Sequence, residues 1–350
     1  MERLKALLRR VDEYQRVHRW LAWPLAVNKK YGDDQAGNQA ALITYYAFFS
    51  LFPLLLVGVT VLGLLLAHNP SLQHRVLNSA LKDFPVLGTQ LRKNIHSLNR
   101  TGVGLGLGLV GTFYGARGVA SAAQNAFNHV WNVPKAERPR FPQNTLRSFG
   151  LMIVGGGGII LTTALSGFGS GSSAPGIRVA ALVVALGLNV VVFWLCFRLA
   201  IAKAVSGRDF RLAAVIAAVI WQILQGFGTF LVSHELKNAS EVYGTFAFII
   251  GLLWWIYFQT QFTLYALEVD VVRAKRLVPR SLVQPPLTTG DERAFQLYVG
   301  EERRRRATEV ELRLNEPVDT APSSNGGRAR AKETSDIRDL ERLPDEGRTS

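Results

Sequence analysis

The sequence predicts an all-α fold, a polytopic membrane protein built as a bundle of six transmembrane helices with both termini in the cytoplasm. Of its 350 residues 48% are hydrophobic, and these are gathered into long blocks between charged connections. The block from Ala36 to Ala67 carries no charged residue. As a helix it would extend ~48 Å, against ~30 Å for the hydrocarbon core of a bilayer. A soluble core helix has no reason to be apolar all round over that length.

The basic residues predict the orientation. The chain has 40 Lys and Arg residues and a formal net charge of +14. Most of these residues fall before the first block, in the connections after the second and fourth blocks, and after the last block. The positive-inside rule therefore places the N-terminus in the cytoplasm. Without the second span, the connection from Arg198 to Arg211 and the basic region after Leu267 would lie outside, so we predict six spans.

Residues 1–35 are predicted to form a cytoplasmic or interfacial segment, with a basic amphipathic helix over residues 1–23. Apolar residues recur there at near-helical spacing among basic ones, and Trp20 and Trp23 follow. Such a helix can lie on an anionic membrane surface with its tryptophans at headgroup level. The alternative is a helix docked on the protein's own cytoplasmic face, and the sequence leaves both open. Because charges run through the segment, we expect no cleavable signal peptide.

The transmembrane domain is predicted over residues 36–277. Pro53 gives the first span a place to bend, because it lacks the N–H that would pair with the carbonyl of Phe49. Ser50 and Thr44 lie nearby and could satisfy the freed backbone groups. The expected spans are about 40–67, 101–119, 148–169, 179–197, 212–233 and 242–267.

The regions outside the spans are polar. We expect one or two short helices at the outer face between His68 and Arg100. Residues 278–350 are predicted to be a charged, largely disordered cytoplasmic tail, with a charged helix over Asp291–Leu314. Basic residues near a membrane surface attract anionic lipid by ~1 kcal/mol each. The expected partners are therefore the bilayer and its anionic lipids, at the N-terminal helix and at the tail, and no nucleic acid.

Three segments resemble one family in the expected order. Residues 40–56, AALITYYAFFSLFPLLL, resemble the signature of the YihY/BrkB family of bacterial inner-membrane proteins (virulence factor BrkB, formerly labelled ribonuclease BN-like). Residues 124–133, QNAFNHVWNV, resemble its segment after the second span, and residues 243–270 resemble its last span. The resemblance covers roughly 33–276. It implies six spans and cytoplasmic termini, whereas the ribonuclease and virulence labels identify no reaction.

Two glycine motifs need separate interpretation. Gly106, Gly108 and Gly111 match GxGxxG, but a dinucleotide site requires a preceding strand and an acidic residue further on. Inside an apolar span, small residues at i and i+4, such as Gly111 and Gly115, instead let helices approach closely. The run Gly155–Gly158 either breaks the third helix at mid-membrane, as in several transporters, or packs against a neighbour, which we favour.

Polar residues within or beside the spans are the candidate functional residues, because polar groups in lipid usually face a bundle interior or a cavity. Arg117 either reaches the cytoplasmic interface or pairs with Glu268 inside the bundle. No catalytic, cofactor or metal site is expected, since the six histidines are scattered and Cys196 is alone. The candidates are Tyr45, Tyr46, Ser50, Pro53, Arg117, Asn125, Asn128 and Glu268.

These observations predict an integral inner-membrane envelope protein that is not an enzyme. The tyrosine and serine residues of the first span, the mid-span glycines and the bordering Arg and Glu suggest a transporter or flippase of a lipid-like or small amphipathic substrate. The alternative is a non-transporting scaffold for envelope partners, and the chain could form homo-oligomers. Ribonuclease activity is not expected, because no carboxylates and histidines cluster as metal-assisted hydrolysis requires.

Overall fold

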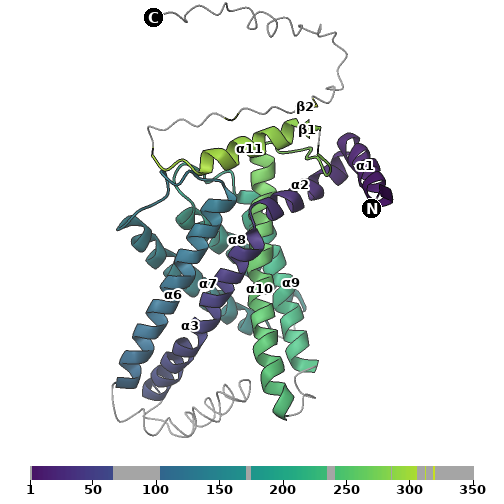
Figure 1. The fold of residues 1–350 in the computed structure, drawn as a ribbon. Coiled ribbons are helices and arrows are strands. Elements are labelled where there is room, and N and C mark those ends of the chain that lie inside the picture. Colours follow the sequence, from purple (N-terminus) through teal and green to yellow (C-terminus); the bar gives the residue numbers. More distant parts are fainter. Residues whose placement is uncertain are drawn as a thin grey trace, which may run out of the picture.

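The computed structural model is almost entirely helical, which confirms the all-α class (Figure 1). The helices expected between His68 and Arg100 and most of the tail lie outside the described residues. Long helices form a bundle, and the N-terminal and C-terminal helices form a cap across one end. The structure describes residues 2–65, 103–170, 175–234, 241–284 and 286–305, with 312 and 318–319.

Each bundle helix overlaps one expected span and extends beyond it. Among the described residues, Val179–Ala200 is long and apolar enough to cross a membrane, with a mean hydropathy of 2.6, and Arg211–Gly226 is a shorter apolar stretch. Only 11% of the most apolar part of Val179–Ala200 is buried, unlike a soluble core helix. The bundle helices are α3 (Ala36–Leu65), α6 (Val103–Val130), α7 (Gln143–Ser170), α8 (Pro175–Ala200), α9 (Arg211–His234) and α10 (Glu241–Ala274).

Helices α3 and α6 run antiparallel and pack through glycines of α6. A Cβ added to any of three glycines would come within 3.0 Å of an α3 side chain. This close approach confirms the packing interpretation of Gly111 and Gly115. The facing pairs are Gly111 with Pro53, Gly115 with Ser50 and Gly118 with Tyr46.

The glycine run Gly155–Gly158 does not break its helix, because α7 continues through it. Gly158 lies against Val192 of α8. A Cβ added to Gly155 would lie 4.0 Å from the Cys196 sulfur, also on α8. Gly156 and Gly157 face open space. The run therefore brings α7 close to α8, as the packing alternative predicted.

Two bundle helices end in the same way at the cap. Asn132 after α6 and Arg276 after α10 have φ values of 47° and 53°. The next amide reaches back five residues in each case, from Val133 to the Asn128 carbonyl (2.9 Å) and from Leu277 to the Val272 carbonyl (3.0 Å). This Schellman geometry satisfies the last carbonyls and turns the chain back across the bundle end.

The cap contains α1 (Glu2–Val17), α2 (Arg19–Asp33), α11 (Thr289–Glu301) and the segment from residue 275 to 288. The prediction of one helix over residues 1–23 is wrong, because the extended backbone of His18 (φ −107°, ψ 100°) separates α1 from α2. β1 (Leu287–Thr288) pairs in parallel with β2 (Val318–Asp319). The cap contacts described below favour the docked alternative for the N-terminal segment.

The predicted boundary at residue 278, between the transmembrane domain and a disordered tail, is too early. Thr288 and Asp291 form a capping box, each side chain accepting a hydrogen bond from the other's backbone N–H, and this box starts α11. The helix ends at Glu301 rather than at Leu314. Arg280, Ser281 and Asp291 are fully or almost fully buried, so this part of the predicted tail belongs to the folded protein.

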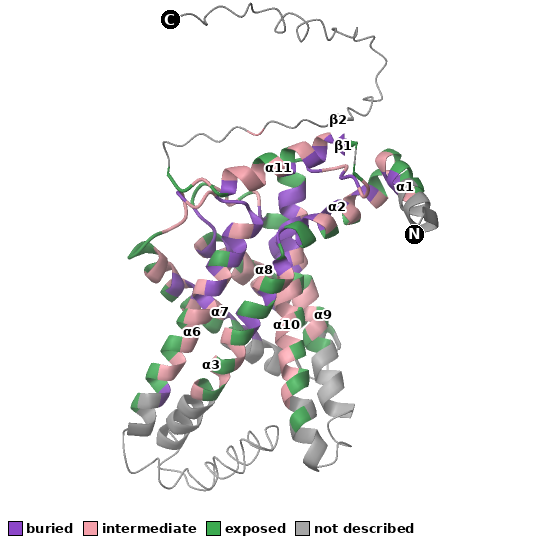
Figure 2. Ribbon diagram, viewed as in Figure 1, coloured by how far each residue is buried: buried purple, intermediate pink, exposed green. Residues whose placement is uncertain are grey.

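Burial is concentrated at the cap end of the bundle (Figure 2). The buried residues of α10 lie between Leu264 and Val272, and those of α3 between Ala36 and Thr44. Further from the cap, α3 and α10 expose aromatic residues such as Phe52 and Trp254. The pair α3 and α6 and the pair α9 and α10 diverge away from the cap (Figure 1).

Candidate functional site

The candidate residues of α3 lie on two faces of the helix. Tyr46, Ser50 and Pro53 pack against α6. Tyr45 is 54% exposed, and its ring lies 4.7 Å from that of Phe49. The hydroxyl of Ser50 donates to the Ala47 carbonyl (2.7 Å). It does not donate to the Phe49 carbonyl, which was the expected acceptor. Thr44 likewise donates to the carbonyl of Ala40 (2.8 Å).

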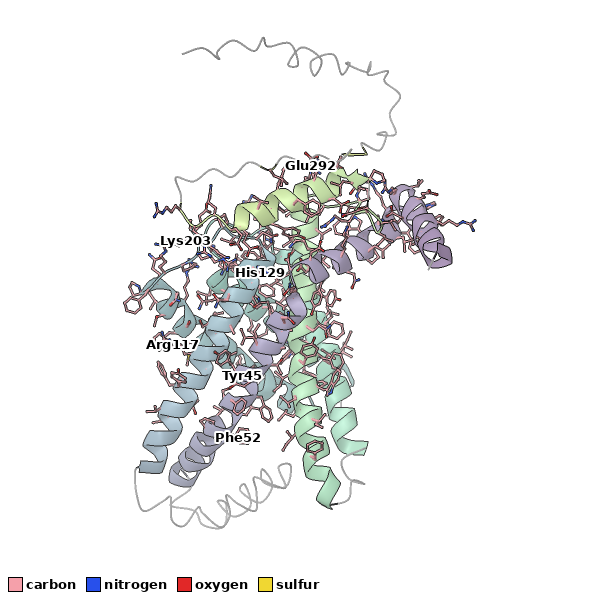
Figure 3. The ribbon with its side chains drawn as sticks, viewed as in Figure 1. Tyr45, Phe52, Arg117, His129, Lys203 and Glu292 are labelled. Carbon is pink, nitrogen blue, oxygen red and sulfur yellow. The ribbon has the colours of Figure 1, made fainter. Side chains whose placement is uncertain are left out.

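The candidates of α6 also separate. Arg117 is exposed, further from the cap than His129 (Figure 3), and Asn125 is exposed as well. Asn128 is 2% exposed and joins α6 to the end of α8. Its Nδ2 donates to the Ala200 carbonyl (2.9 Å), and its Oδ1 accepts from the Ala202 N–H (2.8 Å). Asn128 therefore has a structural role in this arrangement.

Glu268 is fully buried and lies in a group of charges that we call the inner charge cluster: Lys30, Asp34 and Glu268. Lys30 Nζ lies 3.5 Å from Glu268 Oε2 and forms an ion pair with Asp34 Oδ2. It also donates to the carbonyl of Val130 (3.0 Å). The structure therefore gives Glu268 a lysine of α2 as its cation, and the alternative of a pair with Arg117 is wrong.

A second layer of charges lies beside this cluster. His129 Nδ1 is 2.5 Å from Glu301 Oε1, and its Nε2 is 2.9 Å from the Asp34 carbonyl oxygen. Both ring nitrogens thus face oxygen acceptors, which suits the doubly protonated imidazolium. The bond to Glu301 raises the pKa of His129 above its ordinary value, although burial opposes the rise.

Glu301 is the acceptor for three side chains from the α6 end of the cap. Besides His129, Asn132 Nδ2 donates to its Oε2 (2.9 Å) and Arg138 Nη2 donates to its Oε1 (2.5 Å). Burial alone would raise the pKa of Glu301, but the bonds from His129 and Asn132 and the nearby positive charges lower it below its ordinary value. Glu301 is therefore ionised, and its bonds hold the end of α11 against the residues at and after the end of α6.

The inner charge cluster has an excess of negative charge when both its carboxylates are ionised. Within the described part of the chain, neither oxygen of Glu268 accepts a hydrogen bond, and Asp34 Oδ1 has no partner either. A buried carboxylate without full compensation is costly, and protonation removes that cost. No group of three or more His, Cys, Asp or Glu residues suited to a metal ion is present among the described residues. The arrangement can hold one exchangeable proton.

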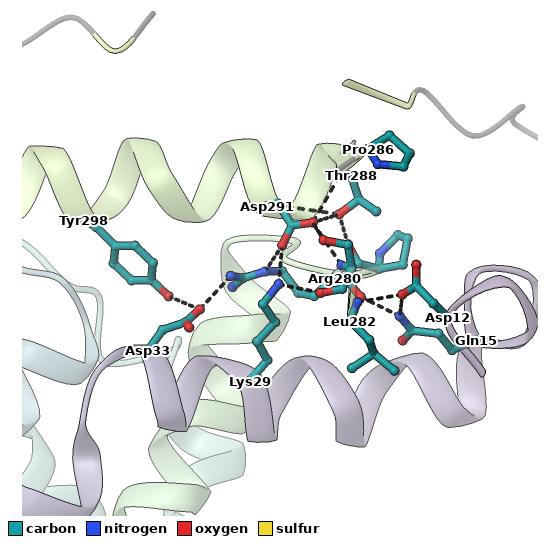
Figure 4. Close-up of polar contacts among 12 residues, drawn as sticks. Asp12, Gln15, Lys29, Asp33, Arg280, Leu282, Pro286, Thr288, Asp291 and Tyr298 are labelled. Carbon is teal, nitrogen blue, oxygen red and sulfur yellow. Dashed lines mark hydrogen bonds and ion pairs between the residues drawn. The ribbon is translucent and has the colours of Figure 1, made fainter. Parts of the chain in front are cut away.

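A separate network fixes the cap around the fully buried guanidinium of Arg280 (Figure 4). Its Nε donates to Asp291 Oδ1 and its Nη2 to Asp33 Oδ2, both at 2.7 Å. Lys29 Nζ lies 3.0 Å from Asp291 Oδ1, and Gln15 Nε2 donates to the Arg280 carbonyl (2.5 Å). These bonds tie α1, α2 and α11 to the chain after α10.

Hydrogen bonds from Ser281 and Thr288 to Asp291 add to this network. Burial would raise the pKa of Asp291, but these bonds and the one from Arg280 lower it far below its ordinary value. Asp291 is therefore an anion throughout the physiological range and holds the two cations in place.

Sequence reasoning identified Glu268 but missed its partners. Lys30 and Asp34 precede the first apolar block and read as ordinary solvated charges. Their spacing of four residues, which puts both on one face of a helix, is the signal that could have found them. Nothing local distinguishes Arg280 from the other arginines of the C-terminal region.

The sequence profile of the family described as Virulence factor BrkB matches residues 27–288. The chain belongs to this BrkB family. The matched range contains the inner charge cluster and Arg280, whereas Asp291 and Glu301 lie beyond its end. Membership confirms the resemblance carried by the three sequence segments.

Relatives of this BrkB chain are membrane proteins. It is 24% identical to the inner membrane protein YhjD of Escherichia coli, over 67% of this chain and 75% of the relative. It is 24% identical to a UPF0761 membrane protein of Acinetobacter baylyi, over 75% of this chain but only 64% of the relative. A UPF0761 membrane protein of Pseudomonas paraeruginosa is 25% identical, over 75% of this chain and 66% of the relative. No solved structure matches the chain. The chain is thus a membrane protein of the BrkB family.

Proposed function

We propose that this BrkB family chain crosses the bacterial inner membrane six times, with both termini in the cytoplasm, and moves a lipid-like or small amphipathic substrate. The distribution of basic residues supports this orientation. The cap supports an even number of crossings, because α1 and α2 bond to the chain that follows α10. The cap would then lie in the cytoplasm.

One observation carries the transport proposal: the bundle is closed at the cap end and its helix pairs diverge away from it (Figures 1 and 2). The closed end holds nearly all the buried residues of α3 and α10, among them the inner charge cluster. At the other end, Phe49, Phe52 and Trp254 are exposed. Burial at one end of a bundle and exposed aromatic residues on diverging helices at the other are what we expect of one state of an alternating-access cycle.

The inner charge cluster supplies a coupling step for such a cycle. Glu268 of α10 faces Lys30 of α2, so taking up or releasing one proton changes the attraction between the cap and the last span. Since a proton on Glu268 removes the excess negative charge of the cluster, proton uptake would favour the packed state of that end and proton release would favour its opening. No covalent chemistry is proposed, and the proposed role is not enzymatic.

The test is lipid movement in proteoliposomes. Purified protein is reconstituted with a trace of fluorescent headgroup-labelled phospholipid, and a membrane-impermeant quencher reports which leaflet the label occupies. We expect the protein to accelerate exchange between leaflets. Tyr46→Ala, which removes the ring packed against Gly118, and Glu268→Gln should slow the exchange several-fold.

The matched control is Tyr114→Ala, because that tyrosine is 75% exposed on α6. It should exchange lipid at the unsubstituted rate. If the protein moves neither lipids nor small solutes, and alanine at Tyr46, Arg117 and Glu268 leaves cells unaffected, the transport proposal fails.

A second candidate function is a scaffold for envelope partners. It is favoured by an exposed apolar surface on the cap, where Tyr14, Val17 and Trp20 are between 50% and 78% exposed. Such a surface suits either the membrane interface or a protein, including a second copy of this chain. Purification in mild detergent should then recover a stoichiometric partner that Trp20→Ala releases.

A further inference from the structure

A cavity of about 880 Å³ lies at the cap end of the bundle, apart from the inner charge cluster. Three regions of the chain enclose it. They are the connection between α6 and α7 with Arg147, the residues Lys203 and Ala204 after α8, and Arg304 and Arg305 after α11. Lys203 lies at the cap end of the bundle (Figure 3).

The cavity is strongly basic. Its lining contains six Lys and Arg side chains and one acidic side chain, that of Glu137. Glu137 is already paired, because its Oε1 accepts from Arg303 Nη2 (2.5 Å). The six cations are Arg138, Arg140, Arg147, Lys203, Arg304 and Arg305.

Two of these cations are engaged elsewhere, and four are not. Arg138 bonds to Glu301, and Arg147 donates to the Ile201 carbonyl (3.2 Å). The other four are exposed, and each lacks an ion-pair partner within the described part of the chain. Burial, followed by the nearby positive charge of Arg198, lowers the pKa of Arg147. Among the residues that the structure describes, no carboxylate therefore balances the charge of these four. The four are Arg140, Lys203, Arg304 and Arg305.

Exposed apolar side chains in and next to the lining indicate headgroup depth, given the membrane orientation proposed above. Phe141, itself part of the lining, is 81% exposed, and Leu146 beside Arg147 is 74% exposed. Both precede residue 148, where the third span is expected to begin. Exposed apolar residues next to clustered arginines are typical of a membrane interface. Arg presents a planar fork that matches phosphate oxygens.

We propose that this cavity binds the phosphate of an anionic headgroup at the cytoplasmic surface of the membrane. Arg140 and Lys203 contact the phosphate from two sides of the cavity, and Phe141 and Leu146 lie along the acyl chains of the same lipid. Binding at this site does not require that the lipid be moved across the membrane. The shared chemistry is a phosphate anion, which a free phosphate compound also offers.

The experiment compares bound lipid in two double variants. Protein in nanodiscs of phosphatidylcholine with a minor fraction of phosphatidylglycerol is released in mild detergent, and native mass spectrometry counts the retained lipids. Arg140→Gln with Lys203→Gln should retain phosphatidylglycerol about tenfold less, since charge-assisted bonds to phosphate are lost. Lys275→Gln with Arg293→Gln removes the same charge from exposed positions of the cap and should retain it fully.

A second arm distinguishes the source of the phosphate. Inorganic phosphate and glycerol phosphate are added to protein held in neutral lipid alone, and bound anion is counted in the same way. Binding of these compounds that matches phosphatidylglycerol and is lost in the Arg140 and Lys203 variant supports a phosphate site filled from solution. Equal phosphatidylglycerol retention by both double variants overturns the proposal. Because the count reports binding and not movement between leaflets, a protein that binds lipid but does not move it fails only the transport proposal.

Discussion

Lys30 is a fully buried cation that faces two almost fully buried carboxylates, Asp34 and Glu268. A buried charge is tolerated when it is paired and hydrogen-bonded, and removing its partner leaves an uncompensated ion. The two carboxylates therefore depend on the one lysine. Loss of the lysine should therefore lower the free energy of unfolding more than loss of the Glu268 carboxylate.

We expect Lys30→Met to reduce the free energy of unfolding by about 3–5 kcal/mol, because two buried carboxylates lose their cation. Glu268→Gln removes a charge from a cluster that has one negative charge in excess, so the unfolding temperature should stay the same or rise. The measurement is thermal unfolding of the purified protein in mild detergent.

Lys275→Met is the matched control, since Lys275 is exposed at the end of α10. It should leave the unfolding temperature unchanged. If Lys30→Met were as harmless as this control, or if Glu268→Gln were strongly destabilising, the charge balance inferred for the cluster would be wrong.

The ion pair between His129 and Glu301 should make stability depend on pH. The raised pKa of His129 means that its contribution is complete below the ordinary value of 6.5 and is lost as pH rises through the folded-state pKa. The lowered pKa of Glu301 means that its contribution is present above the ordinary value of 4.5 and is lost as pH falls.

The difference in unfolding temperature between the unsubstituted protein and His129→Gln should therefore be largest between pH 4.5 and 6.5. It should shrink in more alkaline buffer. Unfolding scans across pH measure it, with His18→Gln at the α1–α2 junction as the control. A difference that grows with rising pH would contradict the assignment of a protonated His129.

At the scale of the elements, glycines set how closely the bundle helices approach. Gly157 and Gly158 are neighbours in α7 with different surroundings. A Cβ on Gly158 would lie 2.7 Å from Val192, whereas one on Gly157 meets nothing within 4 Å. Valine is stiff at χ1 and cannot easily move aside.

We expect Gly157→Ala to be neutral or to stabilise the protein by up to about 1 kcal/mol, because alanine favours helix over glycine. Gly158→Ala should destabilise it, because the contact between α7 and α8 must widen. Unfolding in detergent compares the two single variants directly, and equal effects would show that α7 does not pack on α8 through Gly158.

Sequence patterns predicted the elements better than their contacts. Apolar blocks located every bundle helix, and the spacing of Gly111 and Gly115 predicted a close helix contact. The predicted second span already runs past Arg117 to residue 119, and α6 continues to Val130, because a single charge ends an apolar block but not a helix. The patterns could not predict that Lys30 meets Glu268, since burial of a charge depends on residues more than two hundred positions away.

At the scale of the whole molecule, the cap joins the two ends of the described chain. Gln15 bonds to Arg280 and Lys29 to Asp291, so α2 and α11 must lie on the same side of any membrane that the bundle crosses. This constraint is independent of the distribution of basic residues, and both lead to the same expected topology.

Reporter fusions test that topology. A reporter that is active only in the cytoplasm should be active when it is joined before Met1 and when it is joined after Arg305. A reporter that is active only outside should be silent at both positions. Opposite results at the two ends would refute both the even number of spans and the cap contacts.

The bonds around Arg280 also bear on how the protein is made. The residues of α2 leave the ribosome early, yet the side chains that pair with Lys29 and Asp33 are translated only after the last span. A nascent chain must therefore keep these charges in water until synthesis reaches Asp291. A chain cut short before that point cannot close its cap, and the exposed N-terminal helices would mark it for proteolysis.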